Sequence, residues 1–337
     1  MAGAGVAPDR HRAHGAHRVA GPGRLTPPGS VVAADLDPWR TRLVGLDAVG
    51  PAPVVACSGG ADSVALLALV VATGRTPTAV HVDHGLRAEA PGEAATVAAI
   101  AGRLGVAARS VAVTVAPGAN LEARARTARY AALEAERRAV GADCVLVGHT
   151  ADDQAETVLL NLLRGSGAAG LGAMAVRRDR IVRPLLGLRR ADCVAVCDRL
   201  GVVPVHDPMN DDPAFRRVVV RDEVLPLLGA VAGRDLVPVL ARQAEVLRSE
   251  SEYLDELARA AWPPDPDRPC ADVLARLPLV IARRAVRQWL GAPPPSFAEV
   301  GRVLAVAGGA ARATEVAGGR RVWRRGGLLH VTARAAG

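Results

Sequence analysis

Residues 54–67 have the sequence VVACSGGADSVALL, and this stretch decides how the chain folds. Its first residues are apolar and β-prone and its last residues begin an amphipathic helix, so a glycine-rich turn leads directly from a strand into a helix. Such a turn directs several backbone N–H groups at one point, and the helix macrodipole adds partial positive charge there. Gly59 and Gly60 permit positive φ and leave room for phosphate oxygens. The stretch therefore predicts an anion-binding loop that includes Ala61.

The residues of this loop distinguish it from two common classes of phosphate-binding loop. A Walker-type loop needs a lysine that reaches the outer phosphates, but the chain contains no lysine, so all 42 basic residues are arginine. The G-x-G-x-x-G fingerprint of dinucleotide-binding folds is also absent here. Ser58 and Ser63 supply hydroxyl donors, and Asp62 is placed to hold a metal ion or to cap the helix. The alternative is a glycine-rich turn without a ligand, and the motif alone leaves both interpretations open.

Length and composition are those of a globular protein. The 337 residues are enough for two domains, and the chain is 50% hydrophobic and 23% charged. Its net charge of +8 favours a polyanionic partner, although solvated arginine faces would give the same charge. No apolar run approaches the roughly 18–20 residues that span a bilayer, so we expect no membrane partner. Five scattered cysteines favour reduced thiols and a cytoplasmic location.

Predicted strands and helices alternate from residue 36 to about 205. This order predicts an α/β fold, a Rossmann-like parallel sheet with helices on both faces. In such sheets ligands bind beyond the carboxyl ends of the strands. The predicted strands are 53–57, 78–82, 110–115, 143–147 and 181–183, and the predicted helices are 63–72, 91–104, 121–140, 152–163 and 189–200.

The rest of the chain is predicted in three parts around this α/β domain, which we assign to residues 36–222. Residues 1–35 lack periodicity and are predicted to be a disordered tail. Residues 223–262 are predicted to be a helical connector with helices at 223–228 and 236–257. Residues 263–337 are predicted to be a small α+β domain, whose elements are helices at 272–290 and 297–307 and strands at 320–324 and 328–331.

The end of the second predicted strand carries the sequence HVDHGLR. His81, Asp83 and His84 leave a parallel strand beside the glycine-rich loop, where they could contact the base and ribose of a nucleotide. Alternatively, one histidine only caps the strand.

A later helix carries two arginines three residues apart. Arg126 and Arg129 share one helix face, so both can point at a single anion. Exposed arginines without a ligand are the alternative.

The fourth predicted strand leads into the sequence GHTADDQAET. Asp152 is placed to be the helix N-cap. Asp153 and Glu156 are three residues apart and are expected to face the ligand together, where two carboxylates could bind Mg²⁺ or an ammonium group. His149 is a candidate for proton transfer.

Taken together and in this order, these motifs resemble the tRNA(Ile)-lysidine synthetase family of the PP-loop ATP pyrophosphatases. The resemblance covers residues 52 to 228. It rests on segments 58–63, 81–87, 125–130, 148–157, 164–171 and 210–227. The chain departs from the family at Val218, where an asparagine is usual.

The resemblance implies an ATP-dependent ligation. ATP adenylates the C2 oxygen of the wobble cytidine of a tRNA(Ile) with a CAU anticodon, and L-lysine then displaces AMP. Residues 58–63 would hold pyrophosphate, Asp62 and Asp153 would hold Mg²⁺, and Arg126 and Arg129 would stabilise adenylyl transfer. Asp153 and Glu156 would receive the lysine amine, and the C-terminal domain would bind tRNA. The oligomeric state is left open, and a homodimer is one alternative.

Two other functions remain as alternatives. The first is another PP-loop tRNA-modifying enzyme, such as a cytidine thiolase, but such enzymes carry cysteine pairs and this chain has no Cys-x-x-Cys. The second is a non-catalytic, nucleotide-dependent RNA-binding protein, which would not need the carboxylates and arginines noted above.

Overall fold

The computed structural model describes residues 33–83, 90–114, 118, 121–206, 211–262 and 269–332. Most of the predicted tail, residues 1–32, lies outside this range. Ala33–Leu36 form a 3-10 helix, η1, and α1 (Asp37–Arg40) follows. Leu36 is fully buried in the main core, and Asp35 pairs with Arg199 at 2.9 Å. The last three residues of the predicted tail are therefore part of the fold.

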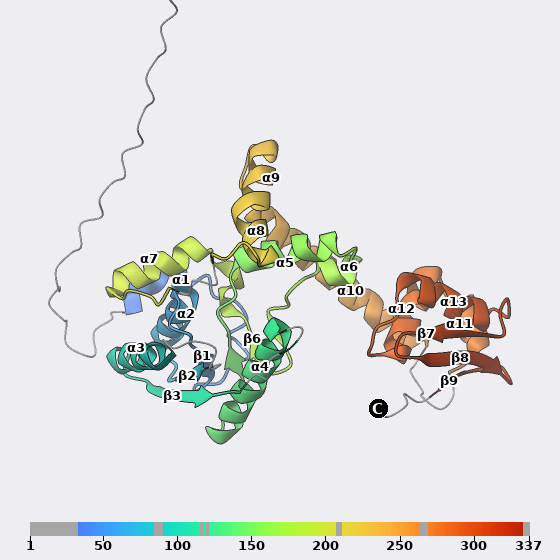
Figure 1. The fold of residues 1–337 in the computed structure, drawn as a ribbon, viewed down its shortest axis with the longest axis horizontal. Helices are drawn as coiled ribbons and strands as arrows, with labels where there is room; N and C mark the ends of the chain where they lie inside the picture. Colours follow the sequence, from blue (N-terminus) through green and yellow to red (C-terminus); the bar gives the residue numbers. More distant parts are fainter. Residues whose placement is uncertain are drawn as a thin grey trace, which may run out of the picture.

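Among the described residues, six strands form one sheet in the order β3-β2-β1-β4-β6-β5 (Figure 1). All neighbouring pairs are parallel except β5 with β6. The predicted strand at 110–115 lies about three residues earlier in the structure, because β3 pairs with β2 from Ala107 opposite Thr78. The strands are β1 (Val54–Ala56), β2 (Thr78–Asp83), β3 (Ala107–Ala112), β4 (Val145–Leu146), β5 (Arg177–Arg178) and β6 (Ile181–Val182).

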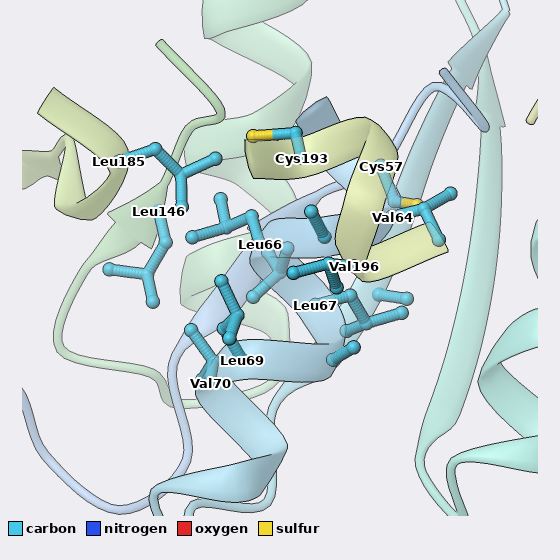
Figure 2. Packing of buried hydrophobic residues seen from close by; sticks show 14 of the residues in the cluster. Cys57, Val64, Leu66, Leu67, Leu69, Val70, Leu146, Leu185, Cys193 and Val196 are labelled. Carbon is cyan, nitrogen blue, oxygen red and sulfur yellow. The ribbon is translucent and has the colours of Figure 1, made fainter. Parts of the chain in front are cut away.

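Helices cover both faces of this sheet, which confirms the predicted α/β fold class. Val55 and Leu146 point into the core formed with α2, α3 and α7, part of which is shown in Figure 2. Val54 and Val145, their neighbours in sequence, point to the opposite face and pack with Leu133 of α4. The helices are α2 (Ala61–Ala72), α3 (Ala90–Arg103), α4 (Leu121–Ala139), α5 (Ala151–Leu163) and α7 (Arg190–Leu200).

A second group of helices follows the sheet. The short helices α6 (Ala168–Leu171) and η2 (Pro184–Gly187) lie between α5 and α7. The helix predicted at 223–228 begins earlier, as α8 (Arg216–Val219), passes through a π-helical turn, η4 (Val220–Val224), and ends as α9 (Leu225–Ala232). The long α10 (Val237–Ala261) packs against α5 and extends to the C-terminal elements (Figure 1).

The C-terminal elements pack around a core of their own. The single helix predicted at 272–290 is wrong. The chain forms α11 (Ala271–Arg276) and α12 (Leu279–Leu290), because Pro278 has no N–H and cannot continue the first helix. The helix α13 (Phe297–Ala307) precedes an antiparallel sheet of β7 (Ala313–Val316), β8 (Arg320–Arg325) and β9 (Leu328–Val331). The short strand β7 was not predicted.

Within the described residues, no single helix is long and apolar enough to cross a membrane. The bent pair Arg216–Ala232 and Val237–Ala261 meets the criteria of length and composition only when both parts are taken together, and it bends by 95°.

Candidate active site

The predicted anion-binding loop connects β1 to α2. Gly59 has a φ of +88°, and a Cβ there would lie 2.8 Å from Val205 Cγ2, so both conformation and space require glycine. Gly60, in contrast, has a φ of −69° and does not need positive φ. The Ser63 hydroxyl accepts from the Ser58 N–H at 3.2 Å and donates to the Gly60 carbonyl at 2.9 Å. These bonds hold the loop in shape from inside.

The backbone N–H groups at the start of α2 are open. Those of Gly60, Ala61 and Asp62 have no hydrogen-bond acceptor among the described residues, and no side chain caps the helix. Such N–H groups bind an anion readily. The geometry of the loop is therefore that of an oxyanion-binding site, as the sequence predicts.

The Asp62 carboxylate lies beside this loop in a largely buried position. Burial and the nearby charge of Asp153 raise its pKa to about 6, and Arg190 opposes this shift. Its Oδ2 is 3.8 Å from Arg190 Nε, whereas its buried Oδ1 has no hydrogen-bond partner among the described residues. An unpaired, buried carboxylate oxygen next to a second carboxylate is a site that a cation would stabilise.

Asp153 has a different role in the helix from the one expected. Thr150, not Asp152, is the N-cap of α5, so the predicted cap is wrong. Asp153 Oδ2 accepts from Thr150 N at 2.8 Å and from Thr150 Oγ1 at 2.9 Å, as an acidic residue at the third helical position can. Asp152 instead accepts from Arg190 N at 2.8 Å. The free oxygen of Asp153, Oδ1, is 3.2 Å from Arg190 Nη2.

Glu156 does share a face with Asp153, but its side chain is 0% exposed. Its Oε1 is 3.2 Å from Arg190 Nη1 and 2.9 Å from Arg221 Nε, and its Oε2 is 3.6 Å from Arg217 Nε. We call Asp62, Asp153 and Glu156 the carboxylate cluster, because all three contact the same guanidinium of Arg190.

His149 is neutral at neutral pH. Burial lowers its pKa to about 4 against the opposing effect of Asp153, and the charges of Arg183 and Arg126 lower it further. Its Nδ1 is buried without a hydrogen-bond partner among the described residues. The charges that act on His149 thus come both from the carboxylate cluster and from a second group of arginines.

That second group surrounds Tyr130 on α4. The guanidinium of Arg126 is 5.1 Å and that of Arg129 5.8 Å from the ring centroid, and Arg126 donates to the Tyr130 hydroxyl at 3.3 Å. Burial lowers the pKa of Arg129. Both guanidinium groups lie at the same Tyr130 ring, so the two arginines are on one side of α4. Neither arginine has a carboxylate partner in the part of the chain that the structure describes, so the positive charge of each is not neutralised by an ion pair.

The structure does not test the predicted contacts of His81, Asp83 and His84 with a nucleotide, but it describes two of these residues. His81 is 3% exposed, and its Nδ1 lies 3.2 Å from the Cys57 carbonyl, so its side chain contacts the backbone just before the loop. Asp83 is the last residue of β2. His84 lies outside the described residues.

A cavity of about 410 Å³ has Arg190 in its wall. Its walls combine the acidic and basic side chains of the cluster region with apolar residues of α9 and α10. The lining includes Asp152, Glu156, Arg189, Arg190, Arg221, Leu225, Pro226, Arg234, Asp235 and Val237.

Comparison with known proteins identifies this arrangement. The model of the PP-loop domain family matches residues 45–228, more than half of the chain. A tRNA(Ile)-lysidine synthase of Salinispora arenicola is 41% identical over 329 residues, which are 91% of this chain and 97% of the relative. That of Nocardia farcinica is 46% identical over 257 residues, 74% and 80% of the two chains. The chain belongs to the tRNA(Ile)-lysidine synthase family.

A solved structure supports the fold of this family member. The U34-tRNA thiolase NcsA from Methanococcus maripaludis matches with a TM-score of 0.53 and 17% identity, over 64% of this chain and 79% of that chain. At this identity the match speaks for the shared fold only.

The sequence did not predict that Arg190 joins the three carboxylates. Arginine in the first turn of a helix is unfavourable with the macrodipole, so two arginines at 189 and 190 at the start of a predicted helix were a signal of carboxylate partners. Arg217 and Arg221 also converge on Glu156 from α8 and η4. Only the fold brings these segments to α5.

Asp62, and not the carboxylate cluster as a whole, has the chemistry that Mg²⁺ requires. No group of three or more His, Cys, Asp or Glu side chains in the described ranges is arranged to hold a metal. Mg²⁺ does not need such a group, because it binds one or two carboxylates together with water and substrate phosphates. The unpaired Oδ1 of Asp62, beside the open N–H groups of the loop, meets that requirement.

Proposed function

We propose that this protein ligates L-lysine to C2 of the wobble cytidine of tRNA(Ile) with a CAU anticodon. The C2 oxygen of cytidine attacks the α-phosphate of ATP and pyrophosphate leaves. An amino group of lysine then attacks C2, loses a proton, and AMP leaves. The observation that carries this proposal is the position of Asp62, whose own N–H is one of the open groups of the loop and whose carboxylate shares the Arg190 guanidinium with Asp153.

In this mechanism the loop of residues 58–63 binds the departing pyrophosphate through its backbone N–H groups. Asp62 and Asp153 would hold Mg²⁺, which neutralises charge on the phosphates. Arg126 and Arg129 would stabilise the negative charge of adenylyl transfer. Their lack of carboxylate partners among the described residues supports this assignment, because their charge is not already neutralised.

We assign the cavity beside Arg190 to the approach of lysine. Lysine carries an α-carboxylate, two amines and an apolar stem, and the cavity offers guanidinium groups, carboxylates and an apolar wall of Leu225, Pro226 and Val237. Glu156 lines the cavity and shares the Arg190 guanidinium with Asp153, and the two carboxylates would receive an ammonium group. His149, neutral at neutral pH, would accept the proton that the attacking amine loses.

We assign tRNA binding to the outer face of the C-terminal sheet. Val322 and Leu329 are buried, so their neighbours Arg321, Trp323 and His330 point to the opposite face. The rings of Trp323 and His330 stack with centroids 5.4 Å apart, and Arg321 is exposed beside them. Aromatic rings flanked by arginines suit unpaired bases and phosphates. In this assignment residues 263–337 form the RNA-binding domain and residues 223–262 connect it to the catalytic domain.

A thiolase is disfavoured by the cysteines. Cys57, Cys144, Cys193 and Cys197 are buried, and the sequence has no Cys-x-x-Cys pair. Because ATP, lysine and tRNA are all intracellular, we place the reaction in the cytoplasm.

One experiment tests the proposal directly. Purified protein is incubated with ATP, Mg²⁺, labelled lysine and transcripts of tRNA(Ile) with a CAU or a GAU anticodon, and the RNA is digested and its nucleosides are identified by mass. We expect labelled lysidine from the CAU transcript only, with one pyrophosphate released for each lysine. A thiolated cytidine, or ATP binding without any modified nucleoside, would refute the proposal.

A further inference from the structure

The guanidinium of Arg190 occupies the space between the three carboxylates of the cluster. Its contacts to Asp153 and Glu156 are 3.2 Å long, and its contact to Asp62 is 3.8 Å long. Among the ion pairs of the described residues, Arg190 is the one cation on Asp62. A side chain of the protein thus lies where the proposed function requires a metal ion and an ammonium group.

The backbone of Arg190 is fixed, whereas its side chain has room to move. Arg190 is the first residue of α7, and its N–H donates to Asp152 Oδ2 at 2.8 Å. Its side chain is 29% exposed and lines the 410 Å³ cavity together with Leu225 and Val237. Rotation about side-chain bonds would move the guanidinium into that cavity without displacing the helix.

Withdrawal of Arg190 would affect the three carboxylates unequally. Glu156 would keep Arg221 at 2.9 Å and Arg217 at 3.6 Å. Asp153 would keep its two hydrogen bonds from Thr150 and its contact with Arg217 at 3.6 Å. Among the described residues, Asp62 would lose its ion pair and keep only the hydrogen bond with the Cys193 thiol. A Mg²⁺ ion bound to the Asp62 carboxylate would lie next to the Arg190 guanidinium that contacts the same carboxylate, and the two positive charges would repel each other. Mg²⁺ and Arg190 therefore compete for Asp62.

We propose that Arg190 is a built-in stand-in cation. It neutralises Asp62 and Asp153 in the unliganded protein, and it leaves them for the cavity when Mg²⁺ and ATP bind. This inference rests on the proposed function only for the identity of the incoming ligands.

Calorimetric titration of the full chain with Mg²⁺ alone tests the inference without any catalytic step. In Arg190→Gln Asp62 loses its cation and, of its ion pairs within the described residues, Asp153 keeps only Arg217 at 3.6 Å, so we expect Mg²⁺ to bind about tenfold more tightly than to the unmodified protein. Adding Asp62→Asn to this variant should abolish the gain. Arg199→Gln, a matched change on the same helix whose partner is Asp35, should leave Mg²⁺ affinity unchanged. Equal or weaker Mg²⁺ binding to Arg190→Gln would overturn the inference.

A second measurement uses the unmodified protein, so it does not depend on whether a variant folds. In a crystal structure of the unmodified protein with Mg²⁺ and α,β-methylene-ATP, the Arg190 guanidinium should lie in the cavity, away from Asp62 and Asp153. Retention of its present contacts to Asp62 and Asp153 would overturn the inference. Failure to form lysidine would refute the proposed function but would leave both of these results interpretable, because neither requires lysine or tRNA.

Discussion

Gly148 lies against the backbone of Asp62. A Cβ at position 148 would be 3.1 Å from the carbonyl carbon and the carbonyl oxygen of Asp62. Gly148 follows β4, whereas Asp62 is in the first turn of α2, so this contact joins the anion-binding loop to the segment that carries Asp153. Glycine at this position therefore sets how closely the two carboxylates approach each other.

A side chain at position 148 should push these segments apart. We expect Gly148→Ala to lower the free energy of unfolding by about 1–3 kcal/mol, because the atoms it meets are backbone and cannot rotate away. Urea denaturation measures this change. Gly102→Ala is the matched control, since Gly102 is helical with open space around it, and it should stabilise the protein by about 0.5–1 kcal/mol. A neutral result for Gly148→Ala would mean that the contact adapts at no cost.

Asp62→Asn should abolish lysine incorporation while the protein remains folded. The substitution removes the charge that would hold Mg²⁺, but Asp62 Oδ1 has no hydrogen-bond partner among the described residues that the change could break. Lysine incorporation and circular dichroism are measured on the same preparation. Near-normal turnover by the folded variant would exclude a metal ligand at Asp62.

The N-cap of α5 should contribute measurably to stability. Thr150→Ala removes the hydroxyl that caps the helix and donates to Asp153 Oδ2, and we expect a loss of about 1 kcal/mol. Thr150→Ser keeps the hydroxyl and should restore most of this stability. Thermal denaturation of the three proteins compares them, and equal losses in Ala and Ser variants would show that the methyl group matters instead.

His149 should make the protein less stable as pH drops from about 6.5 to about 4, whereas Asp62, whose pKa is raised to about 6, changes the stability in the opposite direction over part of this range. Its pKa is lowered from 6.5 to about 4 by burial, so the unfolded chain binds a proton in this range and the folded chain does not. The contribution of His149 is complete above pH 6.5 and amounts to at most about 3 kcal/mol. Compared with the unmodified protein, His149→Gln should lose less stability between pH 6.5 and pH 4, whereas the exposed His206→Gln should follow the unmodified profile. Parallel profiles for His149→Gln and the unmodified protein would contradict the assignment.

Binding of tRNA should weaken with salt through the C-terminal sheet. Replacing Arg321 and Arg325 by glutamine should reduce the slope of log affinity against log salt by roughly 0.7–0.9 for each phosphate contact removed. Filter binding at several salt concentrations gives this slope, and Arg199→Gln serves as a control that removes one positive charge outside the C-terminal sheet. An unchanged slope would place the tRNA phosphates elsewhere on the protein.

The sequence predicted the anion-binding loop more completely than it predicted the contacts of the carboxylate cluster. The run from Val54 to Leu67 predicted a strand, a turn and a helix because its signals are local, and all three are present. Helix and strand limits were less accurate where pairing decides them, as in β3, and a proline divided the helix expected at 272–290. The cap of α5 was assigned to Asp152 although Thr150 and Asp153 form the reciprocal pair.

By itself, the sequence determined the α/β fold class, the anion-binding loop and the order of the motifs, since hydrophobic period, glycine position and helix start are properties of neighbouring residues. Only the tertiary structure decided that Arg190 joins Asp62, Asp153 and Glu156, and that Glu156 has no exposed surface. Those contacts connect residues up to 128 positions apart in the chain, counted from Asp62 to Arg190. The packing of α2, α5 and α7 decides which of these charged side chains meet, and no local sequence pattern does.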